Sequence, residues 1–175
     1  FNEEPPLEYP IPENENVSAI KFLSDAGITA NELVIGFHPG CATLKNHIKR
    51  RWEPEKFAGL GKKLINKHTA RILIFGGPEE KELKEKIFSL IGSNKVNVVN
   101  AESLTQSAAI LKRCNVFVTN DSSQMHIAAA LGLKVLAIIG PTNPNYIRPW
   151  KTEHQIASLN LDCSPCFFYS PKPLI

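Results

Sequence analysis

The segment VFVTNDSSQMHIAAALGLKVLAIIGPTNP at residues 116–144 carries the clearest structural pattern in the sequence. Its first residues, 116–119, form an apolar run without alternation, as in a parallel strand that is covered on both faces. A helix is predicted over residues 122–131, and a second apolar strand over residues 135–139. The segment therefore predicts a strand–helix–strand unit of a parallel sheet.

The start of this predicted helix offers groups that bind anions. Asp121 and Gln124 have the spacing of a capping box with Asp121 as N-cap, and Gly132 tolerates the left-handed turn that ends a helix. Ser122 and Ser123 add hydroxyls beside the free backbone N–H groups of the first turn. Such a turn at the end of a strand can hold phosphate oxygens, although an ordinarily capped helix accounts for the same residues equally well.

Composition places the chain among ordinary globular proteins. Its 175 residues fit one domain with a full core, and 43% are hydrophobic while 21% are charged. A net charge of +3 gives no indication of nucleic-acid binding. No apolar run approaches the roughly 18 residues of a membrane span.

Strands and helices alternate along the chain, which predicts an α/β fold with a doubly wound, Rossmann-like parallel sheet. Strands are predicted at residues 33–38, 71–75, 96–99, 116–119, 135–139 and, less regularly, 155–159. Helices are predicted at residues 16–26, 54–67, 79–91, 104–113 and 122–131, and Ser103 with Gln106 forms a second capping box. With strand order 3-2-1-4-5-6, the first and fourth strands lie side by side at the point where the order reverses.

The composition divides the chain into three segments. Residues 1–15 contain four prolines among Glu and Asn and are expected to be an extended linker from a missing N-terminal domain. Residues 16–160 form the folded domain, and residues 161–175 a Pro- and Cys-containing tail. Because the sequence opens on Phe1 inside the Pro-rich stretch, we expect it to be a piece of a longer protein.

Ligands of doubly wound sheets bind outside the carboxyl ends of the strands at the reversal point. The loop after His38 and the turn at residues 120–123 should therefore flank one cleft, with residues 76–80 beside it. The first of these loops is cationic and contains Lys45, His47, Lys49, Arg50 and Arg51. Arginine grips phosphate with two parallel hydrogen bonds and lysine binds it as a compact charge, so this placement favours a phosphate site over a merely solvated face.

The sequence lacks the motifs of several common nucleotide-binding and metal-binding sites. The sequence contains neither GxGxxG after a strand nor GxxxxGK[ST], which disfavours NAD-type dehydrogenases and P-loop NTPases. The histidines form no metal-ligand pattern, and His126 inside the central helix fits a packed residue better than a catalyst. Cys163 and Cys166 make one CxxC pair in a Pro-rich tail; a structural or incidental role is favoured, and metal binding or redox chemistry remains the alternative.

Four motifs resemble those of glycosyltransferase family 9, the lipopolysaccharide heptosyltransferases. They are IGFHPGCA at residues 35–42, RRW at 50–52, FGGPEE at 75–80 and NDSSQMHIAAALGLKVLAIIGPTNP at 120–144. The resemblance covers about residues 33–150, and the CxPC of the tail is also similar to one found in many members. It implies two Rossmann-like domains that face each other across a cleft, the GT-B arrangement, with this chain as the C-terminal, donor-binding half.

The resemblance also assigns roles to individual residues. It places Asp121, Ser122 and Ser123 at the donor's diphosphate, Arg50 or the neighbouring Lys49 as its neutralising cation, Glu80 at the ribose, Ser103 and Leu104 with Glu102 at the base, and His126 near the donor. Two positions depart from the family pattern. Ser123 stands where the family usually has Gly, and Arg50 stands where it usually has Lys, which bears on the identity of the substrate more than on donor binding.

The implied reaction is inverting glycosyl transfer from a nucleotide sugar such as ADP-heptose to a lipid-linked core oligosaccharide, without cofactor or metal, in the cytoplasm at the inner membrane. The general base is expected on the N-terminal domain, so no catalytic residue is assigned here and this chain alone is not expected to transfer a sugar. Three alternatives remain: a GT-B enzyme of different specificity such as a sugar epimerase, a non-enzymatic nucleotide-binding domain, and a flavodoxin-like module.

Overall fold

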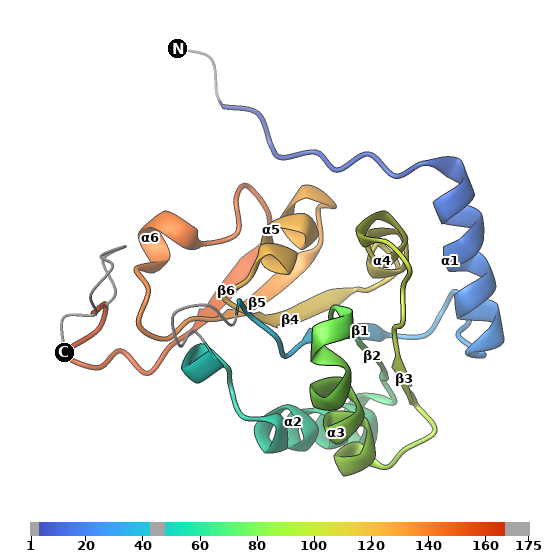
Figure 1. The fold of residues 1–175 in the computed structure, drawn as a ribbon, viewed down its shortest axis with the longest axis horizontal. Coiled ribbons are helices and arrows are strands. Elements are labelled where there is room, and N and C mark those ends of the chain that lie inside the picture. Colours follow the sequence, from blue (N-terminus) through green and yellow to red (C-terminus); the bar gives the residue numbers. More distant parts are fainter. Residues whose placement is uncertain (1–3, 43–47, 167–175) are drawn as a thin grey trace.

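The computed structural model describes residues 4–42 and 48–166. In this part of the chain, six parallel strands form one sheet in the order β3-β2-β1-β4-β5-β6 (Figure 1), which confirms the predicted order. The strands are β1 (Val34–His38), β2 (Arg71–Ile74), β3 (Val96–Val98), β4 (Val116–Asn120), β5 (Lys134–Ile138) and β6 (His154–Ala157). Strands β1 and β4 are paired from Ile35 with Val116 to His38 with Thr119, so their carboxyl ends lie side by side.

Helices cover both faces of the sheet, as the alternating pattern predicts (Figure 1). They are α1 (Glu13–Asp25), α2 (Pro54–His68), α3 (Lys81–Ile91), α4 (Leu104–Leu111), α5 (Ser123–Ala130) and α6 (Pro144–Ile147), with a 3-10 turn η2 (Pro78–Glu80) before α3. Helices α2 and α3 pack on one face, and α1, α4 and α5 pack on the other. None of the described helices combines the length and the apolar character that crossing a bilayer needs.

Each face of the sheet has its own core because successive strand residues point to opposite sides. In β1, Val34 faces the core under α1, α4 and α5, whereas Ile35 and Phe37 face the core under α2 and α3. Phe37 and Phe57 are fully buried with ring centroids 5.5 Å apart. Burying a side chain of this size contributes about 1.5–3 kcal/mol, so these apolar runs hold the strand ends that build the site.

Helix α1 begins earlier than predicted, and one short helix was not predicted. Helix α1 begins at Glu13, three residues earlier than expected, because the extended backbone of Pro12 (φ −62°, ψ 150°) leads directly into a helix whose first turn holds Glu13 and Glu15. Acidic side chains are favourable at that end of the helix dipole. The four-residue helix α6 was not predicted; Asn143 caps it by accepting a hydrogen bond from the Asn145 N–H at 3.0 Å.

The predicted capping box at α5 is wrong. Ser122 is the N-cap and no side chain caps the helix, while the Asp121 carboxylate accepts hydrogen bonds from Arg50 and Thr142 instead. Gln124 does not reach back to the helix start, and its buried side-chain oxygen has no partner in the described part of the chain. At the other end of the helix, Gly132 adopts φ +73°, which confirms the predicted left-handed turn.

The second capping box, at α4, is confirmed in its first half. Ser103 is the N-cap and its hydroxyl accepts from the Gln106 N–H at 2.9 Å. The Gln106 side chain accepts from the Glu102 N–H at 2.7 Å rather than from the Ser103 N–H. The helix therefore has both hydrogen bonds of a reciprocal cap, but the second arm reaches one residue further back along the chain.

Candidate functional site

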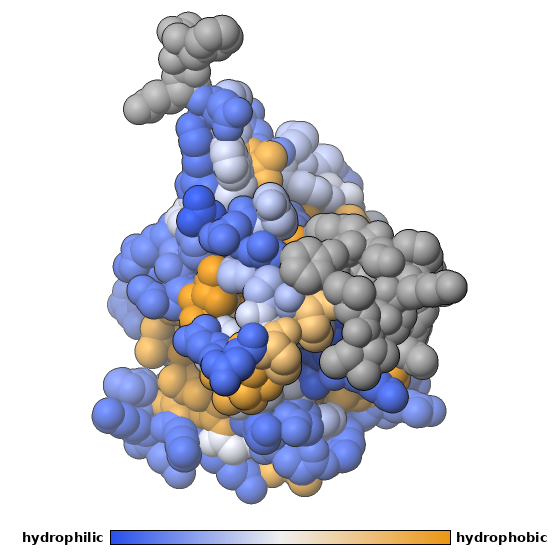
Figure 2. Space-filling model, turned by 90° about the vertical axis from the view of Figure 1, so that its left-hand side faces the viewer, coloured by the Kyte–Doolittle hydropathy of each residue, from blue (hydrophilic) through white to orange (hydrophobic). Residues whose placement is uncertain are grey.

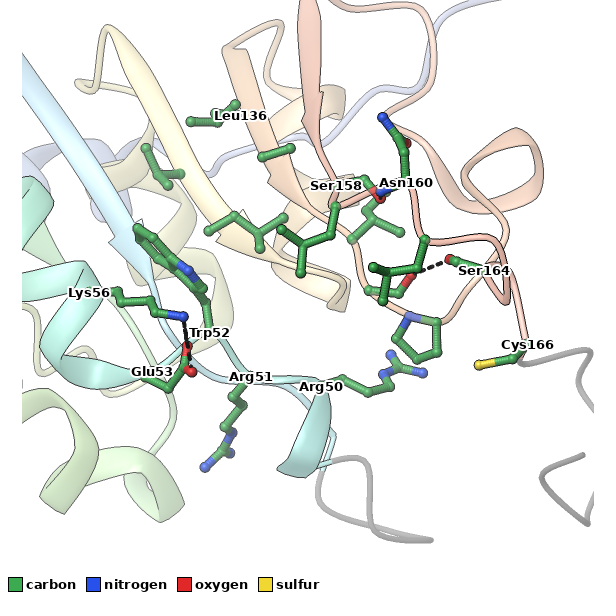
Figure 3. A pocket seen from close by; sticks show the side chains of 18 of the residues that line it. Arg50, Arg51, Trp52, Glu53, Lys56, Leu136, Ser158, Asn160, Ser164 and Cys166 are labelled. Carbon is green, nitrogen blue, oxygen red and sulfur yellow. Dashed lines mark hydrogen bonds and ion pairs between the residues drawn. The ribbon is translucent and has the colours of Figure 1, made fainter. Parts of the chain in front are cut away.

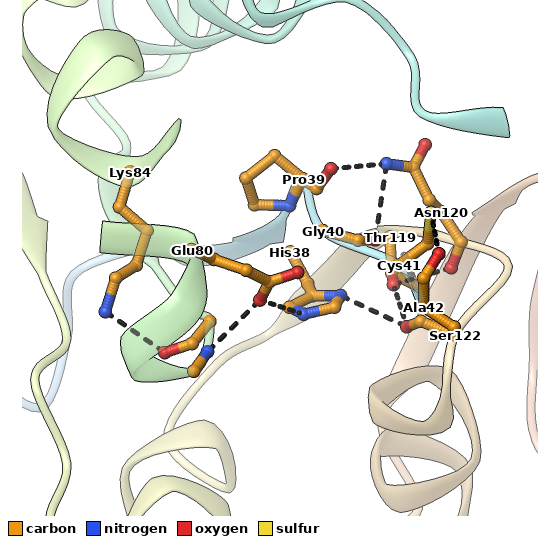
Figure 4. Close-up of polar contacts among 12 residues, drawn as sticks. His38, Pro39, Gly40, Cys41, Ala42, Glu80, Lys84, Thr119, Asn120 and Ser122 are labelled. Carbon is orange, nitrogen blue, oxygen red and sulfur yellow. Dashed lines mark hydrogen bonds and ion pairs between the residues drawn. The ribbon is translucent and has the colours of Figure 1, made fainter. Parts of the chain in front are cut away.

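The carboxyl ends of β1 and β4 are joined by the side chain of Asn120, which is fully buried. Its amide nitrogen donates to the carbonyl oxygen of Pro39 at 2.7 Å (Figure 4), and its oxygen accepts from the Trp52 N–H at 3.0 Å. One side chain at the end of β4 thus fixes both ends of the cationic loop after β1. This confirms that the segments after His38 and around residues 120–123 lie together.

The turn after β2 reaches the same place through Glu80, which is 5% exposed. Glu80 Oε2 lies 3.2 Å from His38 Nε2 (Figure 4) and accepts from the Gly77 N–H at 3.1 Å. Glu80 Oε1 accepts from Arg51 at 3.2 Å. The carboxylate lies against Gly40, where an added Cβ would be 1.5 Å from Oε1. Gly40 is therefore required so that the backbone of the β1 loop can approach Glu80.

The surroundings of Glu80 keep its carboxylate ionised. Burial raises the pKa of Glu80, but the hydrogen bond and charge of His38, the Gly77 N–H and the Arg51 charge together outweigh burial and hold the pKa below its ordinary value. A buried carboxylate with three hydrogen-bonding partners is a rigid group. It fixes the relative positions of the loops after β1 and β2.

Arg50 lies at the start of α5, as the sequence predicts. Its Nη2 atom donates to Asp121 Oδ2 at 2.7 Å and to the Asp121 carbonyl oxygen at 3.3 Å, and the side chains of this pair are only 14% and 15% exposed. Thr142, from the loop after β5, donates to the same carboxylate oxygen at 2.9 Å. Three loops thus bring a guanidinium, a carboxylate and the uncapped first turn of α5 together.

Ser122 lies between this ion pair and the Glu80 group. Its hydroxyl is 3.1 Å from His38 Nδ1 and 3.2 Å from Thr119 Oγ1. Ser123, the first residue of α5, is exposed. The Arg50–Asp121 pair and the Ser122–His38–Glu80 contacts are therefore adjacent, because Asp121 and Ser122 are neighbours in the chain.

The other predicted site residues in the described part of the chain form no hydrogen bond with this group. Lys49, Ser103 and His126 are exposed, and Leu104 is an apolar side chain with 51% exposure. The exposure of His126 contradicts the interpretation that it is a packed residue. Lys45 and His47 lie outside the described residues.

The sequence did not reveal the buried polar residues that hold the loops of the site in place. His38, Asn120 and Thr119 are buried polar residues at the ends of β1 and β4, and this position at the reversal point is the signal that could have identified them. Lys84 is 2% exposed and donates to the carbonyl oxygens of Gly76 and Val99 at 3.0 and 2.9 Å. It joins the loops after β2 and β3, but a single lysine inside a helix gives no such indication in the sequence.

A separate pocket of about 570 Å³ lies beside this group, on the α2 side of β4, β5 and β6 (Figure 3). Arg50 and Trp52 border it, but its walls are mainly apolar, with Val118, Leu136 and Ile138, and neither Ser122 nor Glu80 lines it. Hydrophobic residues also gather on the surface seen from this side of the molecule (Figure 2). Arg50 and Arg51 line the pocket and also contact Asp121 and Glu80, so the pocket adjoins the strand-end site at these two arginines.

The cysteine pair lies at the border of this pocket. Both Cys163 and Cys166 are free thiols, and the Cys166 N–H donates to the Pro141 carbonyl oxygen at 3.0 Å. Within residues 4–42 and 48–166, no group of three or more His, Cys, Asp or Glu could hold a metal ion. The described part of the tail thus contacts the loop after β5 through the Cys166 backbone and through the Ser164 hydroxyl, which donates to the Gly140 carbonyl oxygen at 3.1 Å.

The comparisons with known proteins all point to one protein family. The sequence model of glycosyltransferase family 9 (heptosyltransferase) matches residues 2–172. The lipooligosaccharide heptosyltransferase 2 of Campylobacter jejuni is 30% identical over 152 residues, which are 84% of this chain and 46% of that protein. The chain thus spans less than half the length of this curated relative.

Solved structures of the same family superpose on this chain. A family 9 glycosyltransferase from Veillonella parvula superposes with a TM-score of 0.78 and 28% identity, over 87% of this chain and 42% of the other. The E. coli heptosyltransferase WaaC with ADP gives a TM-score of 0.63 and 26% identity, over 80% of this chain and 42% of the other. The doubly wound sheet of this chain therefore matches a little under half of each of these proteins.

Proposed function

The chain belongs to glycosyltransferase family 9, and from this premise we propose that it binds the nucleotide diphosphate of a sugar donor of the ADP-heptose type. The observation that carries the proposal is the position of the Arg50 guanidinium at the uncapped start of α5, beside Ser122. The E. coli relative solved with ADP adds support for an adenine nucleotide.

In this proposal, the diphosphate lies at the first turn of α5. The backbone N–H groups there have no side-chain cap, and the positive end of the helix dipole favours an anion. Arg50 pairs with Asp121 in the free chain, so a diphosphate must share the guanidinium or displace the carboxylate. Ser122 and the exposed Ser123 supply hydroxyls, and Lys49 adds a second cation from the solvent side.

The nucleoside is assigned to the neighbouring loops. Leu104 is the exposed apolar side chain at the start of α4 on which a base can pack, next to Ser103. Glu80 is the proposed ribose ligand, but its oxygens already accept hydrogen bonds from three groups, so Arg51 has to shift before a ribose hydroxyl can reach it. We assign His126, which is exposed on α5, to the sugar end of the donor.

The chemical role proposed for this half of the protein is stabilisation of the leaving group. As the bond between sugar and diphosphate breaks, negative charge grows on the diphosphate, and the groups around the start of α5 become more favourable partners. We assign the general base, which removes the acceptor's proton, to a part of the protein outside this chain. Transfer to a lipid-linked oligosaccharide, on the cytoplasmic side of a membrane, remains part of this proposal.

Calorimetric titration of the chain with ADP, UDP and GDP tests the proposal. We expect ADP to bind, and Arg50→Ala to weaken binding by roughly tenfold because a charge-assisted bidentate contact is lost. Arg50→Lys should retain part of the affinity, and Lys62→Ala, an exposed cation of α2, is the matched control that should change nothing. The proposal is wrong if none of the three nucleotides binds at millimolar concentration.

A further inference from the structure

Lys84 is a buried lysine to which the proposed function gives no role. Its side chain extends from α3 and is 2% exposed, and its ammonium group donates to the carbonyl oxygens of Gly76 and Val99 at 3.0 and 2.9 Å. A third hydrogen bond joins it to Asn100 Oδ1 at 3.1 Å. An ammonium group has three hydrogens and no lone pair, so these bonds use its whole hydrogen-bonding capacity. Any part that Lys84 plays in ligand binding must therefore act through the groups that it holds.

The first of these groups is the peptide that joins Gly76 to Gly77, in the turn after β2. Its carbonyl oxygen accepts from Lys84, and its N–H donates to Glu80 Oε2 at 3.1 Å (Figure 4). The peptide is trans and planar, so its C=O and N–H bonds point in opposite directions. Lys84 and Glu80 therefore hold one rigid unit from opposite sides.

Glycine on both sides of this peptide lets it turn over unless another group holds it. A peptide flip changes ψ of Gly76 and φ of Gly77, and neither residue has a Cβ that limits these angles. The flipped peptide would direct the Gly76 carbonyl oxygen at the Glu80 carboxylate, where two acceptors repel each other. The hydrogen bond from Lys84 thus favours the one orientation in which Glu80 has the Gly77 N–H as a partner.

The other two bonds anchor the ammonium group itself. Val99 directly follows β3, and its N–H donates to the Ile74 carbonyl oxygen at 2.9 Å, so its position is fixed by the sheet. Asn100 is the next residue and contributes its side-chain oxygen. Because α3 also packs on the sheet through Ile87, the place of the ammonium group is set by the core rather than by the turn after β2.

Resting on the proposed function, we infer that Lys84 is a positioning residue for the ribose of the donor. It orients the peptide between Gly76 and Gly77, this peptide holds Glu80 Oε2, and Glu80 is the proposed acceptor of a ribose hydroxyl. The hydrogen bonds of Lys84 with the described residues involve neither Arg50 nor the start of α5. Lys84 should therefore affect binding of the ribose and leave binding of the diphosphate unchanged.

Calorimetry with ADP and 2′,3′-dideoxy-ADP separates these two parts, because the nucleotides share diphosphate and base and differ only in the ribose hydroxyls. We expect the unmodified chain to bind ADP roughly tenfold more tightly than dideoxy-ADP, the effect of about one hydrogen bond to a charged group. Lys84→Met should reduce this ratio to about twofold or less by weakening ADP binding, with the affinity for dideoxy-ADP unchanged. Lys86→Met, which removes an exposed lysine of the same helix, is the matched control and should keep the full ratio.

The dideoxy nucleotide also distinguishes positioning from damage to the fold, since a merely structural defect would weaken both nucleotides equally. Lys84→Gln, which keeps an amide donor in place of the ammonium group, should lower the same ratio and replaces Lys84→Met if that variant does not fold. In a Glu80→Ala background, the ratio should already be low and Lys84→Met should not weaken ADP binding further, because Lys84 acts through Glu80.

Four results would overturn this inference and leave the proposed diphosphate site intact. They are an ADP preference that persists in the Lys84 variants, equal weakening of both nucleotides, a Lys84→Met effect that persists in the Glu80→Ala background, and an unmodified chain that binds both nucleotides equally well. Failure of the unmodified chain to bind either nucleotide overturns both the inference and the proposed function.

Discussion

Replacing Gly40 by alanine should break the contacts of Glu80 without straining the backbone. The new Cβ would be 1.5 Å from Glu80 Oε1, whereas ordinary contact begins at 3.4 Å, so the carboxylate must withdraw by about 2 Å. Its bonds to His38 and Arg51, both 3.2 Å long, cannot survive that shift. At about 1.5–3 kcal/mol for each hydrogen bond to a charged group, we expect Gly40→Ala to lower the free energy of unfolding by about 3–6 kcal/mol.

Denaturant unfolding of four variants measures this effect: Gly40→Ala, Gly59→Ala, Glu80→Ala and the double variant with Gly40→Ala and Glu80→Ala. Gly59→Ala, in the middle of α2, is the matched control, because a Cβ there meets nothing within 4 Å and should stabilise the chain by about 0.5–1 kcal/mol. In a Glu80→Ala background, Gly40→Ala should cost far less, since the clashing carboxylate is gone. The reasoning is refuted if Gly40→Ala costs the same in both backgrounds, or is as harmless as Gly59→Ala.

Three further predictions concern the groups around the site. Asn120→Ala removes the donor to Pro39 and the acceptor for Trp52, and should lower the free energy of unfolding by about 2–4 kcal/mol in denaturant titrations; a loss below about 1 kcal/mol would contradict the account. Lys84→Met leaves buried carbonyl oxygens unpaired and should cost about 1–3 kcal/mol in the same assay, whereas the exposed Lys62→Met should be neutral. The pKa of Glu32 is lowered from 4.5 to about 2 by hydrogen bonds from the Thr29 backbone and Arg71. The unfolded chain therefore protonates first, and the stabilisation by Glu32 is present above pH 4.5 and lost as the pH falls towards 2. Melting temperatures of Glu32→Gln should fall less steeply over this window than those of the unmodified chain, and parallel curves would show that Glu32 contributes nothing.

The strand order and the place of the site could be predicted because both follow from patterns that repeat along the chain. Apolar runs without alternation predict parallel strands covered on both faces, and the alternation of strands with helices predicts the doubly wound sheet. The carboxyl ends of β1 and β4 then have to meet, and for that reason Arg50 and the start of α5 are expected to lie close together, as they do. Topology, rather than any single motif, is the informative signal.

The partners of individual polar groups could not be predicted in this way. The spacing of Asp121 and Gln124 fits a capping box, yet Asp121 pairs with Arg50, which lies 71 residues away, and with Thr142 from a different loop. A charged guanidinium offers a stronger hydrogen bond than a backbone N–H, so the distant partner prevails over the local one. The contacts of His38 depend likewise on three loops at once, and no local pattern reports them.

The most direct test of the account is a crystal structure of this chain with ADP. The account predicts the diphosphate at the first turn of α5, with phosphate oxygens within hydrogen-bonding distance of the Arg50 guanidinium and the Ser122 hydroxyl. A diphosphate bound away from both residues, for example in the apolar pocket beside Leu136, would contradict it.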